Sequence, residues 1–397
     1  MTGTAAVDGG VVDVVCLGES MVTFLPSRPG RLADVPSFAR AIGGAESNVA
    51  CALAGAGHSV KWVSRVGADG FGDHLVAAVA AYGVDTGAVR RDPGRPTGIY
   101  FRTATDRATD AHEVLYYRAG SAASAMSPAN VPTDDLDRAR ILHLSGITAA
   151  LSPDCLALMR GLTARRPGRP LLSFDVNHRP GLGRDDPAVL LELARGADLV
   201  FVGEDEAERA WGLDGPASIR EALPEPAVLV VKQGARGAVA YAREAQSAGP
   251  VRPAPERSHD TETRVPAPRV DVVAPVGAGD AFAAGFLSAT LRGLPVGDRL
   301  RYGHLMAAAA LTVPGDLGSP PPAGPSGPED PAGTGSTAHA PAAHALAAGA
   351  PAARYAAPLT LAYADRLVAL DDDRWGTLHL GPGWTAAAPA TEEVRTP

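Results

Sequence analysis

Residues 199–231 read LVFVGEDEAERAWGLDGPASIREALPEPAVLVV, in which two apolar runs of four residues flank a polar segment with a helical pattern. Similar four-residue runs occur at Ile141–Leu144 and at Leu171–Phe174. Short, continuous apolar strands that alternate with helices are typical of a parallel sheet covered on both faces. The sequence therefore predicts an α/β fold with a mainly parallel central sheet.

Two segments have a different pattern of residues. Thr97–Thr103 and Glu113–Arg118 interleave Tyr, Phe and Arg, as antiparallel strands with one exposed face do. We expect a small β-sheet, with strands at about 19–42 and 97–120. Because ligands of open α/β sheets bind at the carboxyl ends of the strands, this small sheet is expected to act as a lid. A homo-oligomer that pairs through the lid would bury the apolar face of these aromatic strands, although the sequence does not fix the oligomeric state.

The amino-acid composition argues against several classes of protein. The 397 residues are 46% hydrophobic, enough for a large core, and 36 basic against 44 acidic residues give a net charge of −8, which argues against a nucleic-acid binder. The three cysteines are odd in number and far apart, so neither a disulfide framework nor a zinc site is expected. No apolar stretch approaches a membrane span and no signal peptide begins the chain, so we expect a cytoplasmic protein with no membrane partner.

The chain divides into three parts. Residues 11–318 are predicted to form the core with its lid. Residues 319–353 contain 25 Ala, Pro or Gly in 35 positions and are predicted to be a disordered insertion. Residues 354–385 resume a helical pattern and are expected to dock on the core as a C-terminal helix and tail. Within the core, Glu244–Pro268 is predicted to be a long surface loop and Val270–Val273 a strand.

The motif with the clearest chemistry is Val276-Gly277-Ala278-Gly279-Asp280, which precedes an Ala-rich helical pattern. Backbone N–H groups at such a helix N-terminus, reinforced by the helix dipole, form an anion site suited to a phosphoryl group. A carboxylate at that point is a candidate base for a substrate hydroxyl, although a helix-capping Asp after a Gly turn is about equally compatible. Neither a Walker loop nor Gly-x-Gly-x-x-Gly occurs.

A second motif, Gly43-Gly44-Ala45-Glu46-Ser47-Asn48, precedes Gly67-Ala68-Asp69-Gly70-Phe71-Gly72. The paired glycines permit close approach of a ligand, and Asn48 can hydrogen-bond a polyol or cap its own helix. Together the motifs resemble the ribokinase-like sugar kinases of the phosphofructokinase-B type, over about residues 13–318. The resemblance implies a three-layer sandwich and transfer of the γ-phosphoryl group of ATP to a sugar hydroxyl with Mg²⁺. Asp280 would be the base, and Gly277, Ala278 and Gly279 would form the anion hole.

Within that family the chain resembles most the 2-keto-3-deoxygluconate kinases. The resemblance rests on Gly18-Glu19-Ser20-Met21, on residues 116–122 (YYRAGSA) and on residues 175–180 (DVNHRP). It implies that the acid sugar is held by Tyr100, Tyr116, Arg118 and Arg179, and arginine forks do bind carboxylates in a bidentate manner. Without these motifs, a solvated strand residue would be the favoured interpretation of Arg118, and a helix-end charge that of Arg179. A kinase for another sugar, such as fructose or ribose, and a non-catalytic sugar- or nucleotide-binding relative are the alternatives.

The nucleotide side is indicated by residues 232–237 (KQGARG), which are similar to a turn that lies beside the nucleotide in the family. The resemblance implies roles for Lys232, Gly234 and Gly237, and an ordinary hairpin turn is the alternative. It also places Glu206 near Mg²⁺ through water, although a first-turn helix acid would look the same. Two segments depart from the family pattern. Ala274-Pro275-Val276 is compatible with a slower enzyme, and Gly203 weakens the assignment of the magnesium site.

Overall fold

An eight-stranded sheet runs through the centre of the protein. The computed structural model describes residues 10–28, 30–103, 113–180, 186–243, 260–313, 315, 317 and 359–386, and the segment 319–353 lies outside them. The strand order is β14(Asp260–Val265)-β13(Ala238–Arg243)-β12(Val228–Lys232)-β11(Leu199–Gly203)-β10(Leu171–Asp175)-β9(Ala139–Ser145)-β1(Val12–Leu17)-β4(Val60–Val63). All neighbours from β12 to β4 are parallel, and only β13 and β14 run antiparallel.

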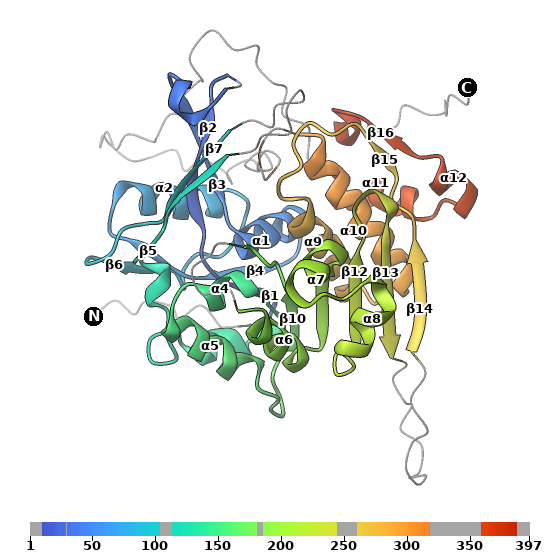
Figure 1. Ribbon diagram of the computed structural model, residues 1–397, viewed down its shortest axis with the longest axis horizontal. Coiled ribbons are helices and arrows are strands. Elements are labelled where there is room, and N and C mark those ends of the chain that lie inside the picture. Colours follow the sequence, from blue (N-terminus) through green and yellow to red (C-terminus); the bar gives the residue numbers. More distant parts are fainter. Residues whose placement is uncertain are drawn as a thin grey trace, which may run out of the picture.

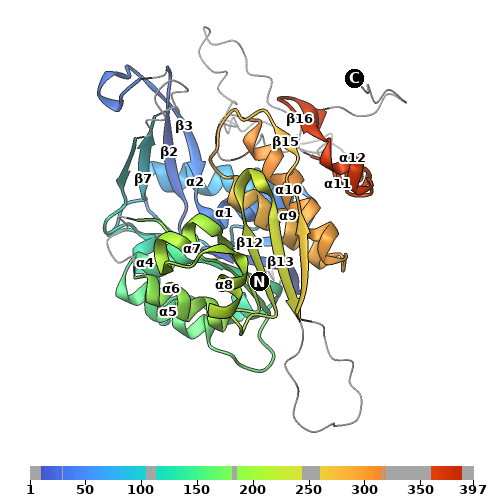
Figure 2. The same ribbon diagram turned by 45° about the vertical axis from the view of Figure 1, so that its right-hand side comes forward.

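Helices cover both faces of this sheet (Figures 1 and 2). Alternating residues of β1 enter two separate apolar clusters, Val14 and Cys16 on one face and Val15 and Leu17 on the other. The first face is covered by α1(Ala45–Gly55), α2(Gly70–Ala80), α9(Ala278–Leu291), α10(Val296–Leu311) and α11(Leu361–Val368). The second is covered by α3(Thr133–Asp137), α4(Gly146–Ala150), α5(Pro153–Thr163), α6(Pro187–Gly196), α7(Glu204–Trp211) and α8(Gly215–Ala222). This is the three-layer α/β sandwich that the apolar runs predict.

A separate four-stranded sheet rises beside α1 and α2 (Figure 1). Its order is β3(Phe38–Gly43)-β2(Met21–Pro26)-β7(Ile99–Arg102)-β8(Val114–Tyr117). The pair β5(Arg65–Gly67)-β6(Arg90–Asp92) and the short helices η1(Leu32–Asp34) and η2(Ala123–Ala125) complete this side of the molecule. The Tyr- and Phe-rich segments therefore form a small sheet, as predicted.

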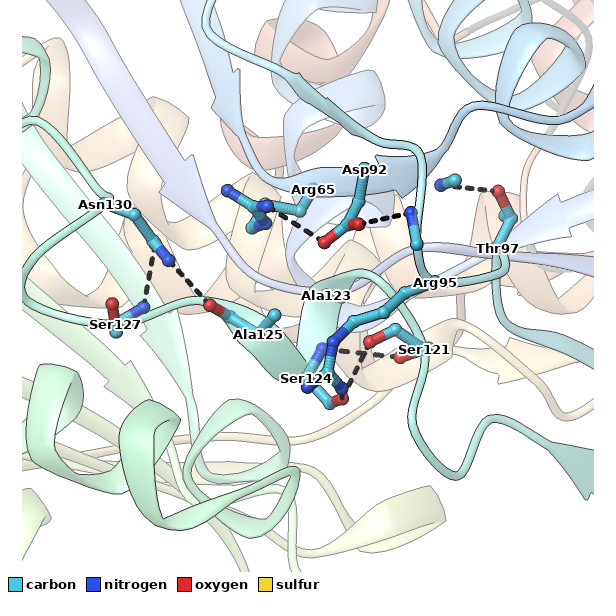
Figure 3. A network of polar contacts seen from close by, with 12 residues as sticks. Arg65, Asp92, Arg95, Thr97, Ser121, Ala123, Ser124, Ala125, Ser127 and Asn130 are labelled. Atoms are coloured by element: carbon cyan, nitrogen blue, oxygen red, sulfur yellow. Dashed lines mark hydrogen bonds and ion pairs between the residues drawn. The ribbon is translucent and has the colours of Figure 1, made fainter.

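Side-chain hydrogen bonds fix the base of the small sheet (Figure 3). Asp69, the N-cap of α2, accepts hydrogen bonds from the backbone N–H and the hydroxyl of Thr97, both at 2.9 Å. The Thr97 hydroxyl in turn accepts one from the N–H of Gly67. Because Thr97 lies two residues before β7, the small sheet leaves the core at a defined point. Figure 3 also shows the neighbouring pairs Arg65–Asp92, Arg95–Ser124 and Asn130–Ser127.

The C-terminal segment is part of the core. Leu359, Ala364, Val368 and Trp375 are buried in the cluster beneath α9 and α10. Strand β16(His379–Leu380), which follows α12(Asp372–Gly376) and precedes η4(Trp384–Ala386), pairs in parallel with β15(Arg269–Val270). None of the helices in the described ranges combines the length and apolar composition needed to span a bilayer.

Two expectations about 244–273 are wrong. Asp260–Val265 is not loop but the edge strand β14, since its charged and Thr residues alternate along an antiparallel edge that needs little apolar content. Residues 244–259 lie outside the described part of the chain. The run Val270–Val273 is a strand only at Arg269–Val270, and Val272 and Val273 are exposed because the chain already bends there toward α9.

Candidate active site

A cavity of about 720 Å³ lies between the carboxyl ends of the parallel strands, the N-terminus of α9 and the small sheet. Residues far apart in the sequence meet in it, as expected for the carboxyl edge of an open α/β sheet. Of the predicted site residues, it is lined by Gly43, Gly44, Asn48, Tyr100, Tyr116, Arg118, Arg179, Glu206, Lys232, Gly277, Ala278, Gly279 and Asp280.

The N-terminus of α9 is the predicted anion hole. Gly277 is its N-cap, with φ of 78°, a left-handed conformation that favours glycine. Ala278, Gly279 and Asp280 form the first turn, where backbone N–H groups have no partner within the helix. Pro275 and Val276 also line the cavity immediately before the turn. The segment can therefore receive an anion on its N–H groups and the positive end of the helix dipole.

Asp280 is held by Asn48, 232 positions away in the sequence. The Asn48 amide donates to Asp280 Oδ2 at 2.8 Å, so Asn48 joins α1 to α9 rather than capping its own helix. Burial raises the pKa of Asp280 to about 7, with Asp175 adding to the rise and the Asn48 hydrogen bond, Arg179 and Lys232 opposing it. A carboxyl group with a pKa near neutrality is well matched to general-base catalysis.

The start of α1 is fixed by hydrogen bonds of Glu46 to β9 and α4. The motif around Glu46 did not indicate this structural role. Glu46 is fully buried, and its Oε1 accepts hydrogen bonds from the Ser145 hydroxyl at 2.7 Å and the Thr148 hydroxyl at 2.9 Å. Burial raises the pKa of this carboxyl group. Gly44, just before the helix, packs so closely that a Cβ there would lie 2.4 Å from the carbonyl oxygen of Glu19. These contacts fix the turn that presents Asn48.

Arg179 reaches the cavity through an unusual backbone turn. After β10 ends at Asp175, Asn177 adopts φ of 43°, a left-handed conformation that Asn tolerates better than most residues. Arg179 then lines the cavity and forms no ion pair within the described ranges of the chain. Its guanidinium is close enough to Asp280 to lower the pKa of that carboxyl group.

The small sheet turns one face to the cavity. Tyr100 and Tyr116 are directly opposite each other on β7 and β8, with ring centroids 5.5 Å apart. Arg118 follows β8, and its guanidinium forms an ion pair with the buried carboxylate of Glu19. Glu19 Oε1 also accepts a hydrogen bond from the Ser121 hydroxyl at 2.5 Å. Arg118 therefore enters the cavity with its charge already balanced by Glu19.

Lys232, the last residue of β12, contacts both carboxylate oxygens of Asp175, at 2.9 and 3.1 Å. Gly234 and Gly237 lie in the turn η3(Gly234–Arg236) and at its end, outside the set of residues that line the cavity. Glu206 does line it, and its Oε2 accepts the N–H of Gly203 at 2.9 Å at the start of α7. Its helix-capping role is thus visible in the structure.

Three charged residues of the cavity were not predicted: Glu19, Arg102 and Asp175. Glu19 and Asp175 each stand at or just after the carboxyl end of a parallel strand, which is a signal for a site residue. Arg102 is two residues after Tyr100 on β7 and therefore shares its face of the strand.

The chain is similar in sequence to known carbohydrate kinases. The profile of the pfkB family of carbohydrate kinases matches residues 12–323 of the chain. The chain is 35% identical over 319 residues to the 2-dehydro-3-deoxygluconokinase of Bacillus subtilis strain 168, covering 77% of this chain and 91% of that protein. It is 31% identical over 316 residues to the Arabidopsis thaliana protein named "Probable fructokinase-6, chloroplastic", covering 76% of this chain and 77% of that one.

A solved structure, that of an uncharacterized sugar kinase from Pyrococcus horikoshii in complex with ATP, superposes with a TM-score of 0.64 at 25% identity, covering 76% of this chain and 93% of that chain. The chain therefore belongs to the pfkB family of carbohydrate kinases.

Proposed function

We propose that the protein transfers the γ-phosphoryl group of ATP to the terminal hydroxyl of 2-keto-3-deoxygluconate (2-dehydro-3-deoxygluconate), giving 2-keto-3-deoxy-6-phosphogluconate. The observation that carries the proposal is the Asp280 carboxylate at the N-terminus of α9, hydrogen-bonded by Asn48 in a cavity that also holds Arg179. The similarity to the Bacillus subtilis kinase supports the acid sugar, and the ATP complex of the Pyrococcus horikoshii relative supports the nucleotide.

In this reaction the sugar hydroxyl lies between Asp280 and the N–H groups of Gly277 to Gly279. Asp280 accepts the hydroxyl proton as the oxygen attacks the γ-phosphorus, and the N–H groups stabilise the charge on the equatorial phosphoryl oxygens. The carboxylate of the sugar, at the other end of the molecule, pairs with the Arg179 guanidinium. Tyr100 and Tyr116 cover the sugar from the small sheet, which acts as the lid.

The family resemblance also implies Mg²⁺. Within the described residues no three His, Cys, Asp or Glu side chains gather as a metal site. Two carboxylates, Asp175 and Glu206, do line the cavity, which fits an ion held mainly by phosphate oxygens and water. When bound, the ion would be held through water by Asp175 and Glu206 and would neutralise part of the charge of the ATP phosphates.

Replacing Arg179 by alanine is expected to discriminate between acid and neutral sugars. A lost charge-assisted hydrogen bond of about 1.5–3 kcal/mol corresponds to a fall of roughly 10- to 150-fold in kcat/KM for 2-keto-3-deoxygluconate. Any turnover of fructose is expected to change by less than about threefold, because fructose has no carboxylate to lose its partner. The measurement is a coupled ADP-release assay on both sugars.

The control is Arg374→Ala, which removes an arginine whose side chain is 76% exposed and which does not line the cavity. Equal loss on both sugars in R179A would contradict the carboxylate role and would favour the second candidate, a fructokinase-like activity. The similarity to the Arabidopsis thaliana protein is the observation that favours that candidate.

We also propose that two copies of the chain pair through the small sheet. The face turned away from the cavity carries an aromatic cluster in which Phe24 stacks on Phe101 at 4.7 Å and Phe38 contacts Phe101 at 5.2 Å. On the same face Leu115 and Tyr117 are 45% and 58% exposed. A second copy of this face would remove that apolar surface from water.

Sedimentation of the wild-type chain is expected to give twice the 40.5 kDa mass of one copy, and Leu115→Asp is expected to give a monomer. Leu171→Asp is the matched control, because Leu171 is 38% exposed on β10, a strand of the large sheet. A wild-type monomer at micromolar concentration would contradict the pairing.

A further inference from the structure

Almost all basic residues of the chain are arginines. Of the 36 lysines and arginines only two are lysines, Lys61 and Lys232. Lys61 lies on β4 and pairs with Asp135 at 3.2 Å and with Asp85 at 3.8 Å. Lys232 lines the active-site cavity. A lysine ammonium is a compact point charge, whereas arginine presents a wide planar fork, so the two are not interchangeable in a confined polar site.

The Lys232 ammonium has a fixed position. It lies between the oxygens of Asp175, which is only 3% exposed, at the ends of strands β12 and β10. One strand, β11, lies between them in the sheet, so the pair reaches across its carboxyl end at Gly203. A carboxylate that contacts one ammonium with both oxygens restricts the rotamers of a long, flexible side chain.

This position is beside the anion hole. Lys232 Nζ lies 3.5 Å from the place that a Cβ on Gly279 would occupy. Gly279 is the second residue of α9, between Ala278 and Asp280. The ammonium and the N–H groups of the helix N-terminus therefore supply positive potential to the same part of the cavity.

Three carboxylates share the cavity with the Lys232 ammonium. Asp175 contacts it directly, and Glu206 and Asp280 also line the cavity.

We infer that Lys232 is a catalytic residue that stabilises the leaving group of phosphoryl transfer, and that Asp175 is its positioning residue. The inference rests on the proposed kinase function. As the sugar oxygen bonds to the γ-phosphorus, the bond from that phosphorus to the bridging oxygen breaks, and its electron pair stays on the β-phosphate of ADP. The sugar proton passes to Asp280. The Lys232 ammonium faces the negative charge that grows on the bridging oxygen.

Charge stabilisation that develops in the transition state affects kcat more than KM. Lys232→Met is therefore expected to lower kcat about 10²- to 10³-fold while the KM for ATP changes by less than about fivefold. Lys61→Met is the matched control, because the side chains of Lys61 and Lys232 are 20% and 17% exposed and each is ion-paired. It is expected to retain wild-type kcat.

A rescue experiment separates catalysis from structure. Lys232→Ala is expected to regain part of its kcat when ethylamine or propylamine is added, because the free ammonium can occupy the vacated space, and Asp175→Asn is expected to reduce that rescue. A purely structural lysine would leave the variant unresponsive to amines. Wild-type kcat in K232M, or absence of rescue in folded K232A, would overturn the inference.

The presence of only two lysines allows a test on the wild-type chain that does not depend on turnover. Reductive methylation followed by peptide mass spectrometry measures the reactivity of both. MgATP is expected to protect Lys232 and to leave Lys61 unchanged. A rise in Tm with MgATP shows that MgATP binds. If Lys232 is then labelled equally with and without MgATP, the inferred role of Lys232 is overturned while the proposed function stands. Absence of wild-type turnover with every sugar would instead overturn the proposed function, and the catalytic role with it.

Discussion

Asparagine at position 280 is expected to lower kcat by about 10²–10⁴-fold while the KM values change by less than about threefold. The amide cannot accept the sugar proton, but it is isosteric with the carboxylate, and its oxygen can still accept the Asn48 hydrogen bond seen at 2.8 Å. Substrate binding is therefore retained and proton transfer is lost. The measurement is steady-state turnover of D280N beside the wild type at saturating ATP and sugar.

The pH dependence of kcat/KM provides a second test of the role of Asp280. Because burial raises the pKa of Asp280 to about 7, the carboxyl group is protonated and inactive as a base in acid. Wild-type kcat/KM is expected to rise with pH through about 7, and the residual activity of D280N is expected to lack that limb.

Stability provides the control for this variant. The pKa of Asp280 is higher in the folded chain than its usual 3.8, so the folded state binds this proton more tightly than the unfolded state does. Asp280 therefore contributes its full stabilising free energy below pH 3.8, and this contribution is lost as pH rises through about 7. At pH 8 D280N is expected to match or exceed the wild-type Tm. A lower Tm with wild-type turnover per folded molecule would contradict the base assignment.

Trp375→Ala is expected to lower the free energy of unfolding by about 3–5 kcal/mol, the range for truncating a large buried aromatic side chain. Trp375 is 1% exposed, and its indole N–H donates to the carbonyl of Pro266 at 2.8 Å. The Arg301 guanidinium lies over its ring at 4.9 Å. The substitution leaves a cavity and an unpaired carbonyl where the C-terminal segment meets the core.

Urea unfolding monitored by circular dichroism measures this loss, with Trp375→Phe as the control that keeps much of the packing volume. The expected loss is large because the segment also holds the strand before the anion hole: Val270 pairs with Leu380, and Asp271 contacts His379 at 2.9 Å. A ΔΔG below about 1 kcal/mol for W375A, the range of surface substitutions, would contradict the view that residues 359–386 belong to the core.

Local sequence patterns predicted most of the central sheet and the start of α9. Four-residue apolar runs mark strands buried on both faces, so β9 to β12 could be placed directly. The start of α9 at Gly277 could be placed because a helix N-terminus is marked by a few consecutive residues. The edge strand β14 was missed, since Asp260–Val265 faces solvent along one side and carries no apolar run.

Contacts between distant residues could not be predicted. Glu19 and Arg118 form their pair across 99 positions, and nothing local to either residue shows that the arginine charge is already balanced. Asp175 and Lys232 meet only because β10 and β12 lie two places apart in the sheet. The hydrogen bond from Asn48 to Asp280 likewise depends on α1 packing beside α9.

The most direct test of the account is the rate of ADP formation by the wild-type chain with MgATP and either 2-keto-3-deoxygluconate or fructose, with the product position assigned by ³¹P NMR. We expect a kcat/KM at least about 10-fold higher for the acid sugar, as one charge-assisted contact requires, and phosphate on its terminal hydroxyl. Equal or greater kcat/KM for fructose would contradict the sugar-acid assignment.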